Sequence, residues 1–185
     1  MRIIAGTARG LKLLSLDSLD TRPTLDRVKE PLFSMLMPYL DGADVLDLFA
    51  GSGALGLEAL SRGASKCTFV DKNPKCRAVI ESNIKKTRFD EKSVVKTEDF
   101  AKFLNSCTEK FSLVFLDPPY KAGVYKDCLK LLCENNLLRD GAVIVLEADA
   151  DEKFSENDFL EFSLLKERKY GRVKLYILQK SHLSQ

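Results

Sequence analysis

Histidine is almost absent from this chain of 185 residues: it contains one, His182, in a polar stretch near its end. Ser-His-Asp hydrolases, HExxH metalloproteases and most histidine-ligated metal sites are excluded, because each needs imidazole groups that the chain does not have. We therefore expect a reaction that runs without imidazole and without a bound metal.

The cysteines are few and show no pairing pattern. Their number, five, is odd, and no two have C-x-x-C spacing, so neither a disulfide framework nor a zinc knuckle is indicated. Because an unpaired cysteine usually behaves as a small hydrophobic residue, we expect reduced and mostly buried thiols. They are Cys67, Cys76, Cys107, Cys128 and Cys133.

Long apolar runs are also missing. None reaches the roughly 18 residues that a membrane-spanning helix needs, and the N-terminus lacks the apolar core of a secretory signal. We therefore expect a cytoplasmic protein with no membrane partner. The length and a hydrophobic share of 45% suffice for one core, which predicts a single compact unit over 41–185, preceded by an extension over 1–40. We expect a monomer.

Charge is nearly balanced, with a formal net charge of +2, which is too small to indicate nucleic acid by itself. The charges are unevenly distributed, however. A basic run over Lys166–Lys174 follows an acidic stretch over Glu147–Glu161. Each run alone is typical of a solvated face.

From residue 44 onward, short apolar runs alternate with segments of helical period. This alternation predicts an α/β fold, in which helices cover both faces of a parallel sheet. The expected strands are Val45–Leu48, Cys67–Val70, Val94–Lys96, Phe111–Leu116 and Ala142–Leu146. The expected helices are Gly56–Arg62, Pro74–Lys86, Phe100–Ser106 and Tyr125–Asn135.

The two ends of the chain depart from this alternation. Phe162–Lys166 and Lys174–Gln179 have no helix between them and predict a hairpin that adds an antiparallel strand to the sheet. At the front, Arg2–Ala5 and Leu11–Leu14 could pair as a small ribbon. A helix is expected over Thr24–Leu36, with a kink at Pro31, which lacks the N–H of one intrahelical bond.

A glycine-rich turn, Gly51-x-Gly53-x-x-Gly56, follows the first core strand and opens a helix. Such a turn lets the backbone approach a ligand closely, and the helix start offers free N–H groups. It is not a P-loop, because Leu57 and Glu58 stand where Lys and Ser or Thr would be needed. It does fit the dinucleotide fingerprint, with Asp71 at the place of a ribose-binding acid, so an NAD enzyme is one candidate.

Asp47 favours a different cofactor, since a carboxylate before the glycines disfavours a pyrophosphate but suits a cationic amino group. The arrangement resembles motif I of the Rossmann-like methyltransferases, which implies S-adenosylmethionine as the cofactor. On that resemblance Asp71 holds both ribose hydroxyls, and Asp99 accepts from the adenine amino group unless it serves only as a helix N-cap. The implied cofactor-binding residues are Asp47, Phe49, Ala50, Gly51, Ser52, Gly53, Asp71, Asp99 and Phe100.

Asp117, Pro118, Pro119 and Tyr120 follow a buried strand, where ligands of open α/β sheets bind. An aromatic amino group is a poor nucleophile because its lone pair is delocalised. If Asp117 and the Pro118 carbonyl each accept one N–H, the lone pair is directed at the methyl group and the developing positive charge is stabilised. Tyr120 would stack on the base. The D/N-P-P-Y/F/W motif marks amino-group methyltransferases acting on adenine N6, cytosine N4, guanine N2 or a glutamine amide.

Two N-terminal segments, Ile3–Leu13 and Thr21–Glu30, resemble the signatures of the RsmD family, the bacterial 16S rRNA guanine-N2 methyltransferases. The similarity continues through the glycine turn and Asp117–Tyr120 to Tyr170-Gly171. It implies a class I methyltransferase fold with a mostly parallel seven-stranded sheet. It also implies a substrate, guanine 966 of 16S rRNA in the assembling small subunit. Leu11 and Pro31 depart from the family pattern.

Arginine suits phosphate recognition because its planar fork binds two oxygens at once. The same resemblance places Arg9, Arg22 and Arg27 nearest the RNA or the closed active site.

Three alternatives remain at this point. A DNA-adenine or protein-glutamine methyltransferase would share the catalytic motif, although a DNA enzyme usually carries a separate recognition domain for which 185 residues leave no room. A non-catalytic cofactor-binding assembly factor is the second alternative. NAD-dependent reduction is the third.

Overall fold

The computed structural model describes residues 1–181 except 17–23, 120–122, 153, 155 and 160; the side chains of residues 24–27, 156 and 157 are also outside the description. Within these residues the chain forms one seven-stranded sheet in the order β3-β2-β1-β4-β5-β7-β6. The strands are β1 (Asp44–Leu48), β2 (Lys66–Val70), β3 (Ser93–Lys96), β4 (Phe111–Leu116), β5 (Leu138–Asp149), β6 (Phe162–Tyr170) and β7 (Val173–Lys180).

The first five strands run parallel to one another, while β7 lies antiparallel to both β5 and β6. The predicted α/β class and the closing antiparallel hairpin are therefore confirmed. β5 and β6 are longer than expected, because pairing with β7 continues past the apolar runs, through residues 147–149 of β5 and through the exposed residues of β6 up to Tyr170.

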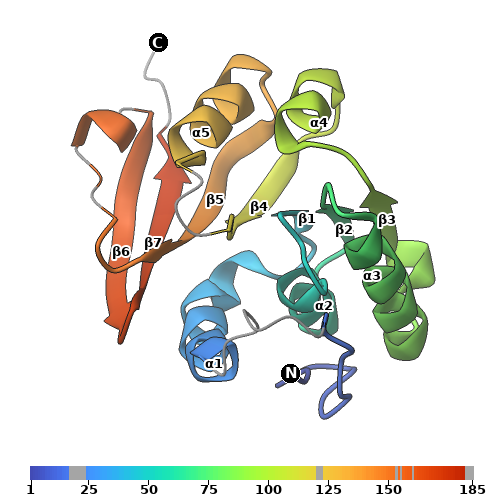
Figure 1. Ribbon diagram of the computed structural model, residues 1–185. Helices are drawn as coiled ribbons and strands as arrows, with labels where there is room; N and C mark the ends of the chain where they lie inside the picture. Colours follow the sequence, from blue (N-terminus) through green and yellow to red (C-terminus); the bar gives the residue numbers. More distant parts are fainter. Residues whose placement is uncertain (17–23, 120–122, 153, 155, 160, 182–185) are drawn as a thin grey trace.

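Helices cover both faces of the sheet (Figure 1). On one face lie α1 (Thr24–Leu36), α2 (Ala54–Ser61) and α3 (Pro74–Thr87); on the other lie α4 (Phe100–Ser106) and α5 (Tyr125–Glu134). Three short 3-10 turns complete the described elements: Met37–Tyr39, Asp90–Lys92 and Glu156–Phe159.

Each face has its own core, because alternate residues of a strand point to opposite sides of the sheet. Phe115 of β4 packs against Phe33 of α1, with ring centroids 5.7 Å apart. Its neighbour Leu116 belongs to the core on the α4 and α5 side. The extension over 1–40 thus shares a core with the sheet. α1 continues through Pro31 without a break in the helix.

The N-terminal ribbon is smaller than predicted. It contains one antiparallel bridge, Arg2 with Lys12, and a few backbone hydrogen bonds around it. Side chains of α2 hold the segment instead: Ser61 Oγ donates to the Ala5 carbonyl at 2.6 Å and accepts from the Ala8 N–H at 3.0 Å. Residues 1–16 therefore form a strap across α2, the N-terminal strap, rather than a regular hairpin.

Candidate active site

The loops after β1 and β4 emerge next to each other. The two strands are parallel neighbours, and Leu48 at the end of β1 pairs with Leu116 at the end of β4. The glycine turn and the Asp117 turn therefore start from the same edge of the sheet.

The backbone of the glycine turn is tightly folded over β2. The N–H groups of Phe49 and Ala50 both donate to the Val70 carbonyl, at 2.9 Å each. Phe49 has a φ of 74°, which is uncommon for a bulky residue, and Gly51 and Gly53 follow at 58° and 77°. Strained backbone of this kind concentrates at ligand sites.

The glycines serve different purposes. A Cβ built on Gly51 would meet no atom within 4 Å, so this residue is suited to close approach of a ligand. A Cβ on Gly56 would come within 2.4 Å of the Phe69 ring and 2.5 Å of the Cys67 sulfur. Gly56 is therefore needed for the contact between α2 and β2.

Asp71, at the end of β2, lies directly beside the turn. Its Oδ2 accepts from the Gly51 N–H at 2.9 Å and its Oδ1 from the Asn73 N–H at 2.8 Å. The sequence interpretation expected both oxygens to face ribose hydroxyls. The structure shows that each oxygen also orders the backbone, and since a carboxylate has about four acceptor sites, lone pairs remain for a ligand.

Asp47 lies beneath the turn rather than on its surface. The residue is 2% exposed, and its Oδ2 accepts from the Gly56 N–H at 2.9 Å, which ties the end of β1 to the start of α2. The pKa of Asp47 is raised to about 8, mainly because burial disfavours the charged form; the Gly56 hydrogen bond lowers this pKa, and the charges of Asp117 and Asp71 raise it. A cation bound beside Asp47 would favour the charged carboxylate and lower this pKa.

The turn after β3 reaches the same place. The ring of Phe100 lies 5.5 Å from that of Phe49, centroid to centroid. Asp99 is the N-cap of α4 and accepts from the Ala101 N–H at 2.9 Å, so the capping alternative is confirmed for one of its oxygens. The helix cap fixes the carboxylate beside Phe100, which is compatible with the predicted role in adenine binding.

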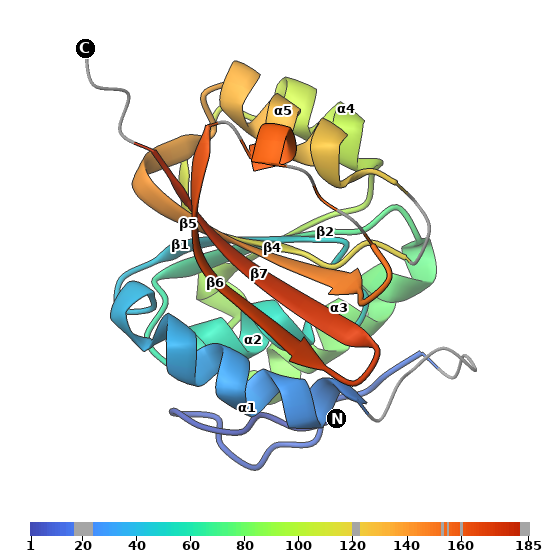
Figure 2. The same ribbon diagram turned by 90° about the vertical axis from the view of Figure 1, so that its left-hand side faces the viewer.

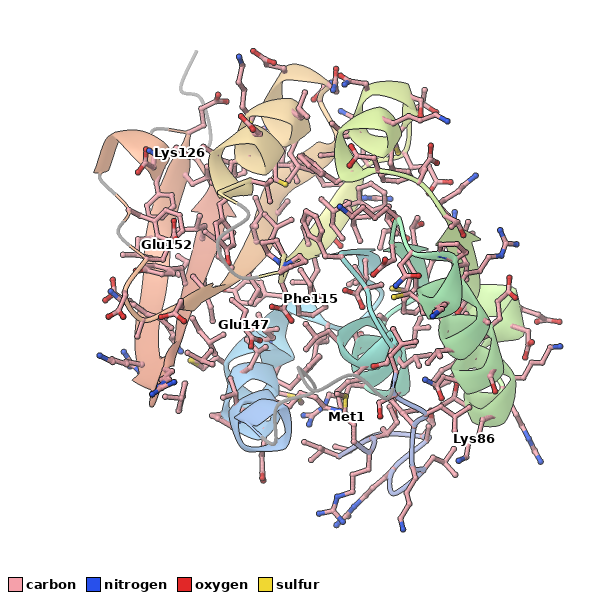
Figure 3. All side chains as sticks on the ribbon, in the orientation of Figure 1. Met1, Lys86, Phe115, Lys126, Glu147 and Glu152 are labelled. Atoms are coloured by element: carbon pink, nitrogen blue, oxygen red, sulfur yellow. The ribbon has the colours of Figure 1, made fainter. Side chains whose placement is uncertain are left out.

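The predicted catalytic motif starts with a half-buried Asp117, followed by a buried Pro118 and an exposed Pro119. Asp117 is close enough to Asp47 and to Tyr125 to raise the pKa of both groups electrostatically. Figure 3 labels Phe115, two residues before Asp117, and Glu147 on the adjoining strand β5. Tyr120 lies outside the described residues.

Of the three predicted arginines, the structure describes the side chain of Arg9. Arg9 is exposed in the N-terminal strap, where it lines a groove with Arg2 and Arg62. Arg62 caps the C-terminus of α2, whereas the glycine turn lies at its N-terminus, about 12 Å away for a helix of eight residues. Arg22 lies outside the described residues, and Arg27 belongs to α1 but its side chain is not described.

Asn83 of α3 is a contact that sequence reasoning missed. Its side chain is fully buried and donates from Nδ2 to the Ser52 carbonyl at 2.9 Å and to the Leu14 carbonyl at 3.0 Å. Its Oδ1 accepts from the Leu14 N–H at 2.8 Å. One amide thereby joins the glycine turn to the N-terminal strap. No local sequence pattern predicts these hydrogen bonds, because the partners of Asn83 are 31 and 69 residues away.

Glu58 is a second missed residue. It is 0% exposed, and its carboxylate accepts from the Ile4 and Ala5 N–H groups at 2.8 and 3.1 Å. It also pairs with Lys29 at 3.1 Å and with Arg62 at 2.7 Å. A charged residue inside the otherwise apolar stretch Leu57–Leu60 was the available signal, since buried charges need partners.

Three cysteines are buried and two are half-buried, and all five are free thiols. Within the part of the chain that the structure describes, no group of three His, Cys, Asp or Glu residues could hold a metal ion. No helix among the described residues is long and apolar enough to cross a bilayer.

Comparisons with known proteins agree over nearly the full chain. Residues 1–179 match the family described as Conserved hypothetical protein 95. The Haemophilus influenzae protein named ribosomal RNA small subunit methyltransferase D is 40% identical over 182 residues, which cover 97% of this chain and 93% of that protein. Its Escherichia coli K12 namesake is 36% identical over 180 residues, covering 97% and 90%.

A solved structure shows the same fold. The Escherichia coli protein yhhF, whose name assigns it provisionally as a methyltransferase, is 35% identical, and the two structures superpose with a TM-score of 0.85 over 98% of each chain. This agreement confirms the Rossmann-like α/β architecture. The chain therefore belongs to the family described as Conserved hypothetical protein 95, which is the RsmD family that its N-terminal segments resemble.

Proposed function

We propose that the protein transfers the methyl group of S-adenosylmethionine to the N2 amine of a guanine in 16S rRNA, in the assembling small ribosomal subunit. One observation carries the proposal: Asp117 follows β4 at the sheet edge where the glycine turn follows β1. The relatives' names support ribosomal RNA of the small subunit as the substrate. The family resemblance points to guanine 966.

The residues around the glycine turn fit this cofactor. Gly51 leaves room for close approach, Asp71 retains acceptor sites for hydroxyl groups, and the buried Asp47 favours a cation. Phe49, directly after β1, and Phe100, at the start of α4, provide two neighbouring aromatic rings. Hydroxyls, an ammonium group and a flat heterocycle are the parts that the cofactor presents.

When bound, S-adenosylmethionine supplies an electrophilic methyl group on sulfur. The chain's part is to hold the amine that receives it. Asp117 and the Pro118 carbonyl accept the two N–H groups of the amine, which turns its lone pair toward the methyl group. Asp117 also stabilises the positive charge that grows on nitrogen. Two consecutive prolines keep this turn stiff, because each ring fixes φ.

The direct test is nucleoside mass spectrometry of ribosomal RNA from a deletion strain. N2-methylguanosine should disappear from one position of the small-subunit RNA and return when the wild-type chain is supplied. Unchanged N2-methylguanosine would refute the guanine assignment. A purified protein that methylates DNA adenine or a glutamine amide instead would favour the related amino methyltransferases.

A further inference from the structure

A groove of about 400 Å³ lies at the end of α2 opposite the glycine turn. Its walls come from the N-terminal strap, α1 and the C-terminus of α2, which lie side by side in Figure 1 and Figure 2. The lining residues that carry charge are Arg2, Arg9, Arg62 and Glu30. Three cations against one anion make the groove a positively charged one.

Arg62 is held in place before any ligand arrives. Its side chain is 10% exposed, its Nε donates to Glu58 at 2.7 Å, and its guanidinium lies over the Phe33 ring at 5.1 Å from the centroid. The two terminal nitrogens make no hydrogen bond within the described residues. They remain as donors on the wall of the groove.

Arg2 and Arg9 of the N-terminal strap also line the groove. Both are exposed, and neither side chain has an ion-pair or hydrogen-bond partner among the residues that the structure describes. The strap on which they stand is fixed, because Glu58 and Ser61 hold its backbone. Three arginine forks on fixed supports are suited to bidentate binding of phosphate oxygens.

We propose that this groove binds a backbone phosphate of the RNA substrate at a distance from the reacting base. The proposal rests on the proposed function, because it takes the substrate to be RNA. It adds Arg2 and Arg62 to Arg9, which was already predicted to contact RNA, and assigns to all three a role in positioning the RNA. A volume of about 400 Å³ lies within the roughly 300–1,000 Å³ of ligand sites and has room for a sugar-phosphate unit. Phosphate contacts set the register of a protein on nucleic acid without reading its sequence.

The test measures the affinity for a 16S rRNA transcript between about 50 and 200 mM salt. The variant Arg2→Ala/Arg9→Ala should bind about tenfold more weakly and reduce the slope of log affinity against log salt by about 1. The control Lys85→Ala/Lys86→Ala removes the same charge from exposed positions on α3 (Lys86 is labelled in Figure 3) and should leave the slope nearly unchanged. An unchanged slope in the arginine variant, or an equal loss in the control, would overturn the proposal.

Arg62→Lys provides a second test in which the ion pair with Glu58 can persist. It should weaken RNA binding while thermal unfolding stays close to that of the wild type, because a lysine keeps the charge but lacks the fork. Inorganic phosphate alone is the competing ligand. If it stabilises the wild type but not Arg2→Ala/Arg9→Ala at constant ionic strength, while both proteins bind the RNA equally well, the groove binds free phosphate and the RNA assignment fails.

Methyl transfer is measured on the same proteins, so the two proposals can fail separately. If the wild type transfers no methyl group to RNA, but the salt slope still falls by about 1 in Arg2→Ala/Arg9→Ala, the proposed function is refuted and the groove proposal stands. If methyl transfer to RNA occurs and the salt slope is the same in Arg2→Ala/Arg9→Ala as in the wild type, the groove proposal alone is refuted.

Discussion

The two loops of the candidate site are fixed by different means. The turn after β1 is held by three side chains: Asp47 and Asp71 accept from the Gly56 and Gly51 N–H groups, and Asn83 donates to the Ser52 carbonyl. The turn after β4 depends on covalent restraint, because Pro118 and Pro119 fix two φ angles and provide no N–H. A hydrogen-bonded turn can be weakened by removing one distant side chain. A proline turn is restrained by its own rings and does not depend on one distant side chain.

The largest expected effect comes from the proline turn. Asp117→Ala should lower kcat by about 100-fold or more, because the amine loses the acceptor that orients it and stabilises its charge. Cofactor affinity, measured by calorimetry, should stay within a few-fold of the wild type. Near-normal methyl transfer by this variant would remove Asp117 from the mechanism.

Asp71→Ala tests the opposite loop. It removes acceptors for the ribose hydroxyls and leaves the Gly51 N–H without its partner, so cofactor affinity should fall by about 10- to 100-fold. With saturating cofactor, the transfer rate should change less than the affinity. Equal cofactor binding by the two proteins would show that Asp71 serves the backbone alone.

Asp47 makes the stability of the first loop depend on pH. Its folded pKa, about 8, lies above the ordinary aspartate value of 3.8, so the folded state retains a proton that the unfolded chain releases. The stabilisation is complete below about pH 4 and is lost as the pH rises toward 8. Asp47→Asn keeps an acceptor for the Gly56 N–H, and its free energy of unfolding should vary less over this range in denaturant titrations. Parallel pH profiles for the two proteins would contradict the prediction.

Gly56→Ala should have the smallest effect on turnover, because the residue packs α2 against β2 and does not face a ligand. The added Cβ would collide with Phe69, which should lower the free energy of unfolding by about 1–3 kcal/mol. Gly51→Ala is the matched control, with no neighbour within 4 Å of its Cβ. It should affect cofactor binding more than stability, although its positive φ adds some strain.

The positions of the strands and helices could be predicted from the sequence, but the depth of Asp47 could not. Strand and helix positions were predictable because apolar runs such as Phe111–Leu116 and the glycine turn leave strong local signals. The position of Asp117 followed from the rule that ligands of open α/β sheets bind beyond the ends of the strands. The depth of Asp47 was not predictable, because it depends on how closely Gly56 lets α2 approach the sheet.

Long-range polar contacts formed the other gap. Glu58 was considered only as an anion unsuited to a P-loop, yet it anchors the strap and orders Arg62. Arg9 was predicted near the RNA or the closed active site, and the structure places it at the opposite end of α2 from the glycine turn. Such placements depend on tertiary packing that no motif records.

The Asn83 amide has a mechanical consequence. It bonds to Ser52 on one side and to Leu14 on the other, so neither segment can shift without breaking a buried hydrogen bond. A buried donor or acceptor left without its partner costs about 1–3 kcal/mol. A shift of Ser52 on cofactor binding would therefore disturb the hydrogen bonds that hold Leu14, and a shift of Leu14 on RNA binding would disturb the glycine turn.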